Sequence, residues 1–250
     1  MLRFLRRSRG SIVEEGNMRK YLIYALGEIL LVVLGILIAV QINNWNQANK
    51  DRQNEQFILS ELQKEFIANE ALISTQIGRL ENAIAYNKDY LDKLVNGSLD
   101  YQAIYDFNAG SQIIVGTSHP SSGVYDTIIS TGEIGLIRND SLRYLLPKWK
   151  DALENFMENE ALHLDFFLNE FLIYVSEHFL RATYREERLD FFDLSEEEIN
   201  EAYLLSAKKT KYRSYVVNNL DWMEGLLLTT NNTRDELLKV LALIESEIDG

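Results

Sequence analysis

The sequence predicts an all-α protein in which one N-terminal transmembrane helix continues into an elongated antiparallel four-helix bundle. Three observations predict this fold. Residues 21–40 are almost entirely apolar, the 250 residues include only 2 prolines, and elsewhere apolar residues recur at steps of three and four. Proline breaks helices, and steps of three and four place side chains on one helix face. No alternating strand pattern longer than a few residues is present.

The apolar stretch, YLIYALGEILLVVLGILIAV, carries a single charge at Glu28. Twenty residues of α-helix span about 30 Å, which is the thickness of a hydrocarbon core. The run from Ile29 to Val40 has no polar face, which argues against the alternative of a buried helix in a soluble domain. Tyr21 and Trp45 are placed to anchor the two membrane interfaces.

Flanking charge predicts the orientation of this helix. Residues 1–20 contain six basic and two acidic residues and so carry a net charge of +4. Because the whole chain carries −13, the remaining 230 residues carry −17. Because basic residues flank the cytoplasmic ends of spans, we expect a basic cytoplasmic segment at 1–20, with Arg19 and Lys20 at the interface. A signal-anchor helix at 21–42 and an external helical-bundle domain at 43–250 then follow.

Two alternatives concern these N-terminal segments. Residues 1–20 could be only a solvated tail, and the apolar stretch could be a cleaved signal peptide. Against cleavage, the apolar region is too long and no A-x-A-like site follows it.

The first arm of the bundle continues from the membrane, since residues 36–77 contain neither proline nor glycine. It ends at Asn96-Gly97, where glycine accepts the left-handed conformation that closes a helix. A short helix capped within residues 98–100 comes next, followed by a loop of mostly small and polar residues at 110–123. A helical piece at 124–131 completes a second arm that is therefore broken.

Capping signals open the remaining helices. Asn139 begins a helix that we expect to reach about residue 183. Ser195 and Glu198 form a capping box that opens a short helix to about residue 207. The last helix runs from about residue 211 to 248, and its apolar seam alternates steps of three and four. That predicted seam comprises Leu220, Met223, Leu227, Thr230, Arg234, Leu237, Leu241, Ile244 and Ile248.

The composition argues against several classes of chemistry. The acidic body disfavours nucleic-acid binding, and the absence of cysteine from the sequence excludes thiolate metal sites and cysteine nucleophiles. Glu160 and His163 match the Glu-x-x-His unit of di-iron bundles, but such sites need two units and two further glutamates. The alternative is an ordinary pair at the edge of the core. We expect no catalytic residue, cofactor or metal, and no enzymatic activity.

Glu28 is the residue that we single out within the span. A charge in hydrocarbon costs several kcal/mol, so it usually faces protein or water. Small residues on the same side would let another helix approach closely. We therefore predict a transmembrane helix contact through Ala25, Glu28, Gly35 and Ala39, either in a homo-oligomer or with a membrane-protein partner. Alternatively, Glu28 snorkels to the headgroups or relays ions.

Two segments resemble a known family. The boxes Y-x-x-Y-A-x-G-E-I and G-I-L-I-A-x-Q-I-N-N-W-N, within residues 21–46, are similar to the N-terminal signature of a Bacteroidota family of single-span membrane proteins that carries a domain of unknown function. The segment STGEIGLIRNDSLR at 130–143 is similar to a second recurring segment of that family. The resemblance implies a Gram-negative cell, and hence the inner membrane and the periplasm. It implies no activity.

The expected function is that of a single-span inner-membrane protein whose periplasmic bundle is a protein-interaction, scaffold or accessory subunit. Its expected partners are membrane lipid and a second transmembrane helix. One alternative is a periplasmic ligand-sensing module that relays through a membrane partner, because 20 cytoplasmic residues are too few for an output domain. Another is an ion-relay subunit that uses Glu28.

Overall fold

The computed structural model describes residues 18–109, 115–179 and 195–248. The regular structure of these ranges is helical, and no strand occurs within them. This confirms the all-α prediction. Contacts divide the chain into two units, Met1–Gln56 and Phe57–Gly250.

The described part of the first unit is a single helix, the beginning of α2 (Met18–Asn96). Nearly all of its side chains from Tyr21 onward are exposed, including the large apolar ones between Leu22 and Val40. Among the described residues, α2 is the one helix that is long and apolar enough to cross a membrane. Residues 1–17 of the predicted basic segment lie outside the described residues.

Helix α2 is continuous, as the absence of breakers predicts. It passes through Asn43-Asn44, although asparagine is a poor helix former, and ends at Asn96. Gly97 follows with φ of +70°, the left-handed conformation predicted for the helix stop.

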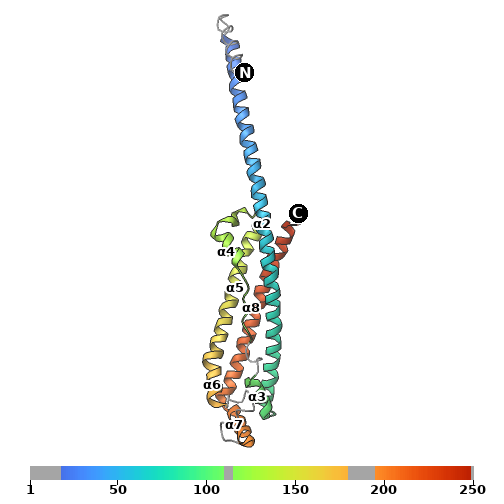
Figure 1. Ribbon diagram of the computed structural model, residues 1–250, viewed down its shortest axis with the longest axis vertical. Coiled ribbons are helices and arrows are strands. Elements are labelled where there is room, and N and C mark those ends of the chain that lie inside the picture. Colours follow the sequence, from blue (N-terminus) through green and yellow to red (C-terminus); the bar gives the residue numbers. More distant parts are fainter. Residues whose placement is uncertain (1–17, 110–114, 180–194, 249–250) are drawn as a thin grey trace. The chain divides into compact units, whose positions relative to one another are not determined.

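The second unit combines long and short helices (Figure 1). Its long elements are the later part of α2, the run of α5 (Asp140–Phe166), the π-helical turn η3 (Phe167–Phe171) and α6 (Leu172–His178), and finally α8 (Thr210–Ile248). Its short elements are α3 (Tyr101–Ala109), α4 (Gly123–Ser130), the 3₁₀ turn η2 (Glu133–Leu136) and α7 (Glu196–Lys208). Helices α5 and α8 pack side by side, with α3 and α7 near one end of the unit and α4 near the other.

The predicted caps begin the helices that they were expected to begin. The Leu142 N–H donates to Asn139 Oδ1 over 3.0 Å at the start of α5. Ser195 and Glu198 form the complete capping box of α7. The α5–α6 run ends at His178, because Phe179 is extended with φ of −125° and ψ of 138°, so the predicted end near residue 183 is about five residues too late.

Two apolar clusters hold the second unit together. One lies among α2, α4, α5 and α8, where the rings of Phe66 and Trp149 are 4.4 Å apart. The other is rich in aromatic residues and joins the end of α2 to α3, α6, α7 and the start of α8. In this second cluster the rings of Tyr90 and Phe107 stack at 3.7 Å.

The predicted seam of α8 faces the core, but the buried face is wider than predicted. Leu220, Met223, Thr230, Leu237 and Ile244 are buried as expected, and the half-buried Leu227, Leu241 and Ile248 also pack against the core. The additional buried positions are Asn219, Leu226, Thr233 and Val240, which lie beside this seam. Polar side chains enter this seam because they find partners, as when Thr233 Oγ1 donates to Ala152 O over 3.0 Å.

Candidate functional site

The predicted transmembrane contact residues share one face of α2. The spacing of Ala25, Glu28, Gly35 and Ala39 keeps them within about a quarter of the helix circumference. Glu28, Gly35 and Ala39 are exposed and Ala25 is half-buried. A Cβ added at Gly35 would meet nothing within 4 Å. Whether a second helix packs here therefore stays a prediction.

The predicted interface anchors lie on the same helix. Tyr21 and Trp45 are exposed. Arg19 and Lys20 belong to α2, but their side chains lie outside the described residues. The anchoring role of all four residues stays a prediction.

Glu160 and His163 both point into the second unit but bind different partners. Glu160 Oε1 accepts hydrogen bonds from Ser118 N–H at 2.8 Å and Gln76 Nε2 at 3.2 Å. His163 Nε2 hydrogen-bonds Asn219 Oδ1 at 3.0 Å. Burial raises the pKa of Glu160 and lowers that of His163. Among the described residues, no three His, Asp or Glu side chains gather in a way that could hold a metal ion.

Buried polar side chains link several helices in layers. One layer continues from His163 of α5 through Asn219 of α8 to Asn87 of α2, where Asn219 Nδ2 donates to Asn87 Oδ1 over 3.4 Å. Another joins the hydroxyls of Tyr90 and Tyr212 at 2.7 Å and continues from Tyr212 to Asn108 Oδ1 at 3.1 Å. Because a slip along the helix axes would separate these partners, the layers fix the register of the unit.

A non-helical segment, residues 115–122, is held by side chains of the long helices. Asn69 makes two hydrogen bonds to the backbone of Ser121, one from its Nδ2 to the carbonyl at 2.7 Å and one from the Ser121 N–H at 2.8 Å. Gln76 Nε2 donates to Gly116 O over 2.8 Å, and Glu160 receives the Ser118 N–H. These side chains replace the backbone hydrogen bonds that a helix would have supplied.

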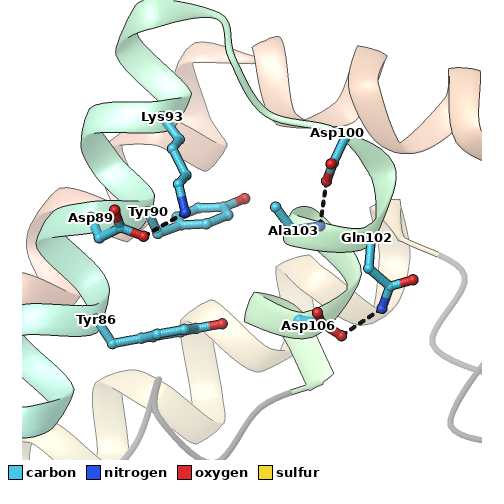
Figure 2. A pocket seen from close by; sticks show the side chains of 8 residues that line it. All are labelled: Tyr86, Asp89, Tyr90, Lys93, Asp100, Gln102, Ala103 and Asp106. Carbon is cyan, nitrogen blue, oxygen red and sulfur yellow. Dashed lines mark hydrogen bonds and ion pairs between the residues drawn. The ribbon is translucent and has the colours of Figure 1, made fainter.

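A cleft of about 240 Å³ lies between the last turns of α2 and helix α3. Figure 2 shows the rings of Tyr86 and Tyr90 extending from α2 toward α3. On α2 the cleft is also lined by Asp89 and Lys93, and on the opposite side by Asp100, Gln102, Ala103 and Asp106. Gln102, Ala103 and Asp106 belong to α3, and Asp100 caps its first turn.

Each charged group of this cleft makes at least one hydrogen bond. Lys93 Nζ donates to Asp89 Oδ2 at 2.6 Å, Ala103 N–H donates to Asp100 Oδ1 at 2.8 Å, and Gln102 Nε2 donates to Asp106 Oδ1 at 2.7 Å. The carboxylates outnumber the single amine, so the cleft carries a net charge of −2. Burial and then the negative field of Asp106 raise the pKa of the nearby Tyr86 hydroxyl.

Sequence reasoning missed the cleft. Tyr86 and Tyr90 lie four residues apart and so share a helix face, which was a signal of a local aromatic surface. The position of α3 opposite that face could not be read from the sequence, because it depends on how the chain turns after Gly97.

The chain matches the model of one protein family over residues 28–178, which is more than half of its 250 residues. No curated protein and no solved structure matches it. The matched range runs from Glu28 in the apolar part of α2 to the end of α6. The chain therefore belongs to DUF6090, a family of unknown function.

Proposed function

We propose that this protein is anchored by a single span in the inner membrane of a Bacteroidota cell, with its N-terminus in the cytoplasm. Residues 43–250 then form a periplasmic domain that acts as a protein-interaction, scaffold or accessory subunit. The observation that carries this proposal is the surface of α2 between Tyr21 and Val40, where large apolar side chains are exposed over the length of a membrane span.

The second unit has the features of a rigid interaction platform. We propose that it works as an elongated antiparallel four-helix bundle whose second arm is broken into α3, the segment 115–122 and α4. The polar layers support this reading, since they hold the helices in one register. Exposed apolar side chains are available for contacts on the α5–α6 run: Tyr144, Met157, Leu162, Leu168 and Ile173.

A pair of reporter fusions tests the proposed topology. A reporter that is active only outside the cytoplasm, fused after Gly250, should be active in cells. A reporter that works only in the cytoplasm should be inactive at the same position. The opposite pattern would place the helical domain in the cytoplasm and overturn the proposal.

Site-specific crosslinking tests the interaction role. Photoreactive residues at Leu162 and Ile173, which are exposed apolar positions, should each yield a discrete crosslinked product in intact cells. The same residue at Arg79 or Glu81, which are exposed polar positions on α2, should yield none. Equal products at all four positions would show random collisions, and no product at the apolar positions would argue against an interface there.

The cleft between α2 and α3 supports a second candidate function. A periplasmic domain that binds a small molecule there would report its presence to a membrane partner. In that case the transmembrane contact of α2 would carry the signal. A third candidate, in which Glu28 relays ions with a partner helix, shares the same requirement for a contact within the membrane.

A further inference from the structure

The cleft between α2 and α3 has the dimensions of a site for a small metabolite. Its volume of about 240 Å³ is below the range of about 300–1,000 Å³ that is usual for drug-sized ligands. Figure 2 shows Tyr86 and Tyr90 of α2 on one side of the cleft and the lining side chains of α3 on the other. A ligand in this space would contact both helices at once.

One wall of the cleft is aromatic. Tyr86 is half-buried and Tyr90 is buried, and both rings stack on Phe107 of α3, at 5.9 and 3.7 Å between centroids. This packing restrains the two rings without any ligand. Because Phe107 covers one face of Tyr90 and Tyr90 is only 3% exposed, the half-buried Tyr86 is the ring that presents a negative face to a cation.

The opposite wall is acidic. Asp89 is paired with Lys93, which leaves the carboxylates of Asp100 and Asp106 as the source of the net negative charge. Each of these two carboxylates uses Oδ1 for a hydrogen bond within α3. Within the described ranges, neither Oδ2 atom makes a hydrogen bond, so both oxygens are available to a ligand.

We propose that this cleft binds a small organic cation that carries an alkylammonium group. An aromatic wall opposite carboxylates is complementary to a cation with an apolar surface, such as a quaternary ammonium. An anion would be repelled by the net charge, and among the described residues, the cleft included, no three His, Asp or Glu side chains gather in a way that could hold a metal ion. The proposal deepens the second candidate function, since it names the class of molecule that would be sensed.

Calorimetric titration of the full chain in detergent micelles, at constant ionic strength, tests the proposal with choline as the probe. Its uncharged isostere, 3,3-dimethyl-1-butanol, has the same shape without the charge. We expect saturable binding of choline and binding of the isostere that is weaker by about tenfold or more. No saturable binding of choline, or equal binding of both compounds, would overturn the proposal.

Variants locate the binding in the cleft. Asp106→Asn and Tyr86→Leu should each weaken choline binding by about tenfold, because one removes a charge and the other a ring. Lys93→Gln should strengthen it by several-fold, because it removes the competing cation of the cleft. This gain cannot come from unfolding, so it keeps the proposal testable if Tyr86→Leu fails to fold.

Matched controls complete the test. Asp151→Asn and Tyr144→Leu make the same chemical changes on the exposed surface of α5, and both should bind choline like the parent. Equal losses in the controls, or weaker binding by Lys93→Gln, would place binding elsewhere. If choline fails to bind while crosslinks at Leu162 and Ile173 persist, the ligand inference is wrong and the interaction function stands.

Discussion

Glu160 illustrates what a single residue contributes to this molecule. Its carboxyl receives hydrogen bonds from an amide side chain and a backbone N–H, and neither group carries a charge. Burial raises its pKa, against the opposing effects of the Ser118 hydrogen bond and of His119. The sequence placed Glu160 and His163 on one helix face, but their partners lie 42 to 84 residues away and could not be predicted from local spacing.

The raised pKa of Glu160 predicts how stability depends on pH. The unfolded chain loses this proton near pH 4.5, whereas the folded chain holds it to higher pH. As pH rises from 4.5 through the raised folded-state pKa, this group therefore lowers the free energy of unfolding. Glu160→Gln stays neutral, so we expect it to be more stable than the parent at pH 7, by an amount on the order of 1 kcal/mol.

Urea unfolding of the full chain in micelles at pH 4 and pH 7 checks this prediction. The advantage of Glu160→Gln should largely disappear at pH 4, because the Glu160 carboxyl of the parent is then mostly protonated in both the folded and the unfolded chain. Glu158→Gln, at an exposed position of α5, should show no such difference. Destabilisation by Glu160→Gln at pH 7 would show that an ionised carboxylate stabilises the fold.

Leu237 is a core residue by both sequence pattern and structure, since it is fully buried in α8. Leu237→Ala leaves a cavity and should cost about 2–5 kcal/mol of unfolding free energy. Leu228→Ala removes the same atoms from a side chain that is 63% exposed, and should change stability by no more than about 0.5 kcal/mol. Similar small losses for both variants in denaturant titrations would mean that the α8 seam faces solvent.

At the scale of elements, the sequence predicted helix boundaries because their signals are local. Gly97 and the caps at Asn139 and Ser195 act within four residues of the helix ends that they define. The face of α8 was harder to predict. The buried face is wider than the apolar pattern indicates, because Asn219 and Thr233 find hydrogen-bond partners in other helices and so are buried beside the apolar seam.

The segment 115–122 shows the same limit more strongly. Glycine and proline predicted that it is not helical, but its position depends on Asn69 and Gln76, which precede it by about 40 to 50 residues. No periodic pattern encodes such contacts between side chain and backbone. These contacts depend on how the helices pack in three dimensions.

Asn69 is expected to hold this segment against α2. Asn69→Ala removes both hydrogen bonds to Ser121, so the local free energy of opening should fall by about 1–3 kcal/mol. Hydrogen exchange of the Ser121 amide should then be faster by about tenfold or more. Asn155→Ala, at an exposed position of α5, is the matched control and should leave this exchange unchanged. Unchanged exchange in Asn69→Ala would show that apolar contacts alone retain the segment.

At the scale of the whole molecule, the two units differ in what surrounds their side chains. The second unit buries apolar clusters and polar layers, so its helices could be predicted from seams and caps. The large apolar side chains of the first unit are exposed between Tyr21 and Val40, so burial within the described residues does not identify the functional face of this helix. Composition alone predicted a membrane span, and the pattern of small residues around Glu28 predicted which face a partner would use.

This face gives the last prediction, which concerns assembly in the membrane. If α2 packs against a second helix through its small-residue stripe, Gly35→Leu should hold the backbones apart and lower the yield of crosslinked species in native membranes. Glu28→Leu should also lower it, although this change makes the span more apolar. The second effect separates a specific contact from general hydrophobicity, because greater apolarity by itself would favour insertion. Single cysteines introduced just after the apolar stretch, near Trp45 of α2, in a chain that otherwise has none, report the yield by disulfide formation.

Val33→Leu is the matched control, because residue 33 lies on the side of α2 opposite Glu28 and Gly35. It should crosslink like the parent. If both stripe variants also crosslink like the parent, the stripe faces lipid and Glu28 extends to the headgroups. A third outcome is distinct from both: if Glu28→Leu abolishes function in cells while its crosslinking persists, the carboxyl relays ions between helices that associate without it. Glu28→Asp would then restore function in part, because it keeps an ionisable group within the span, whereas Glu28→Gln would not.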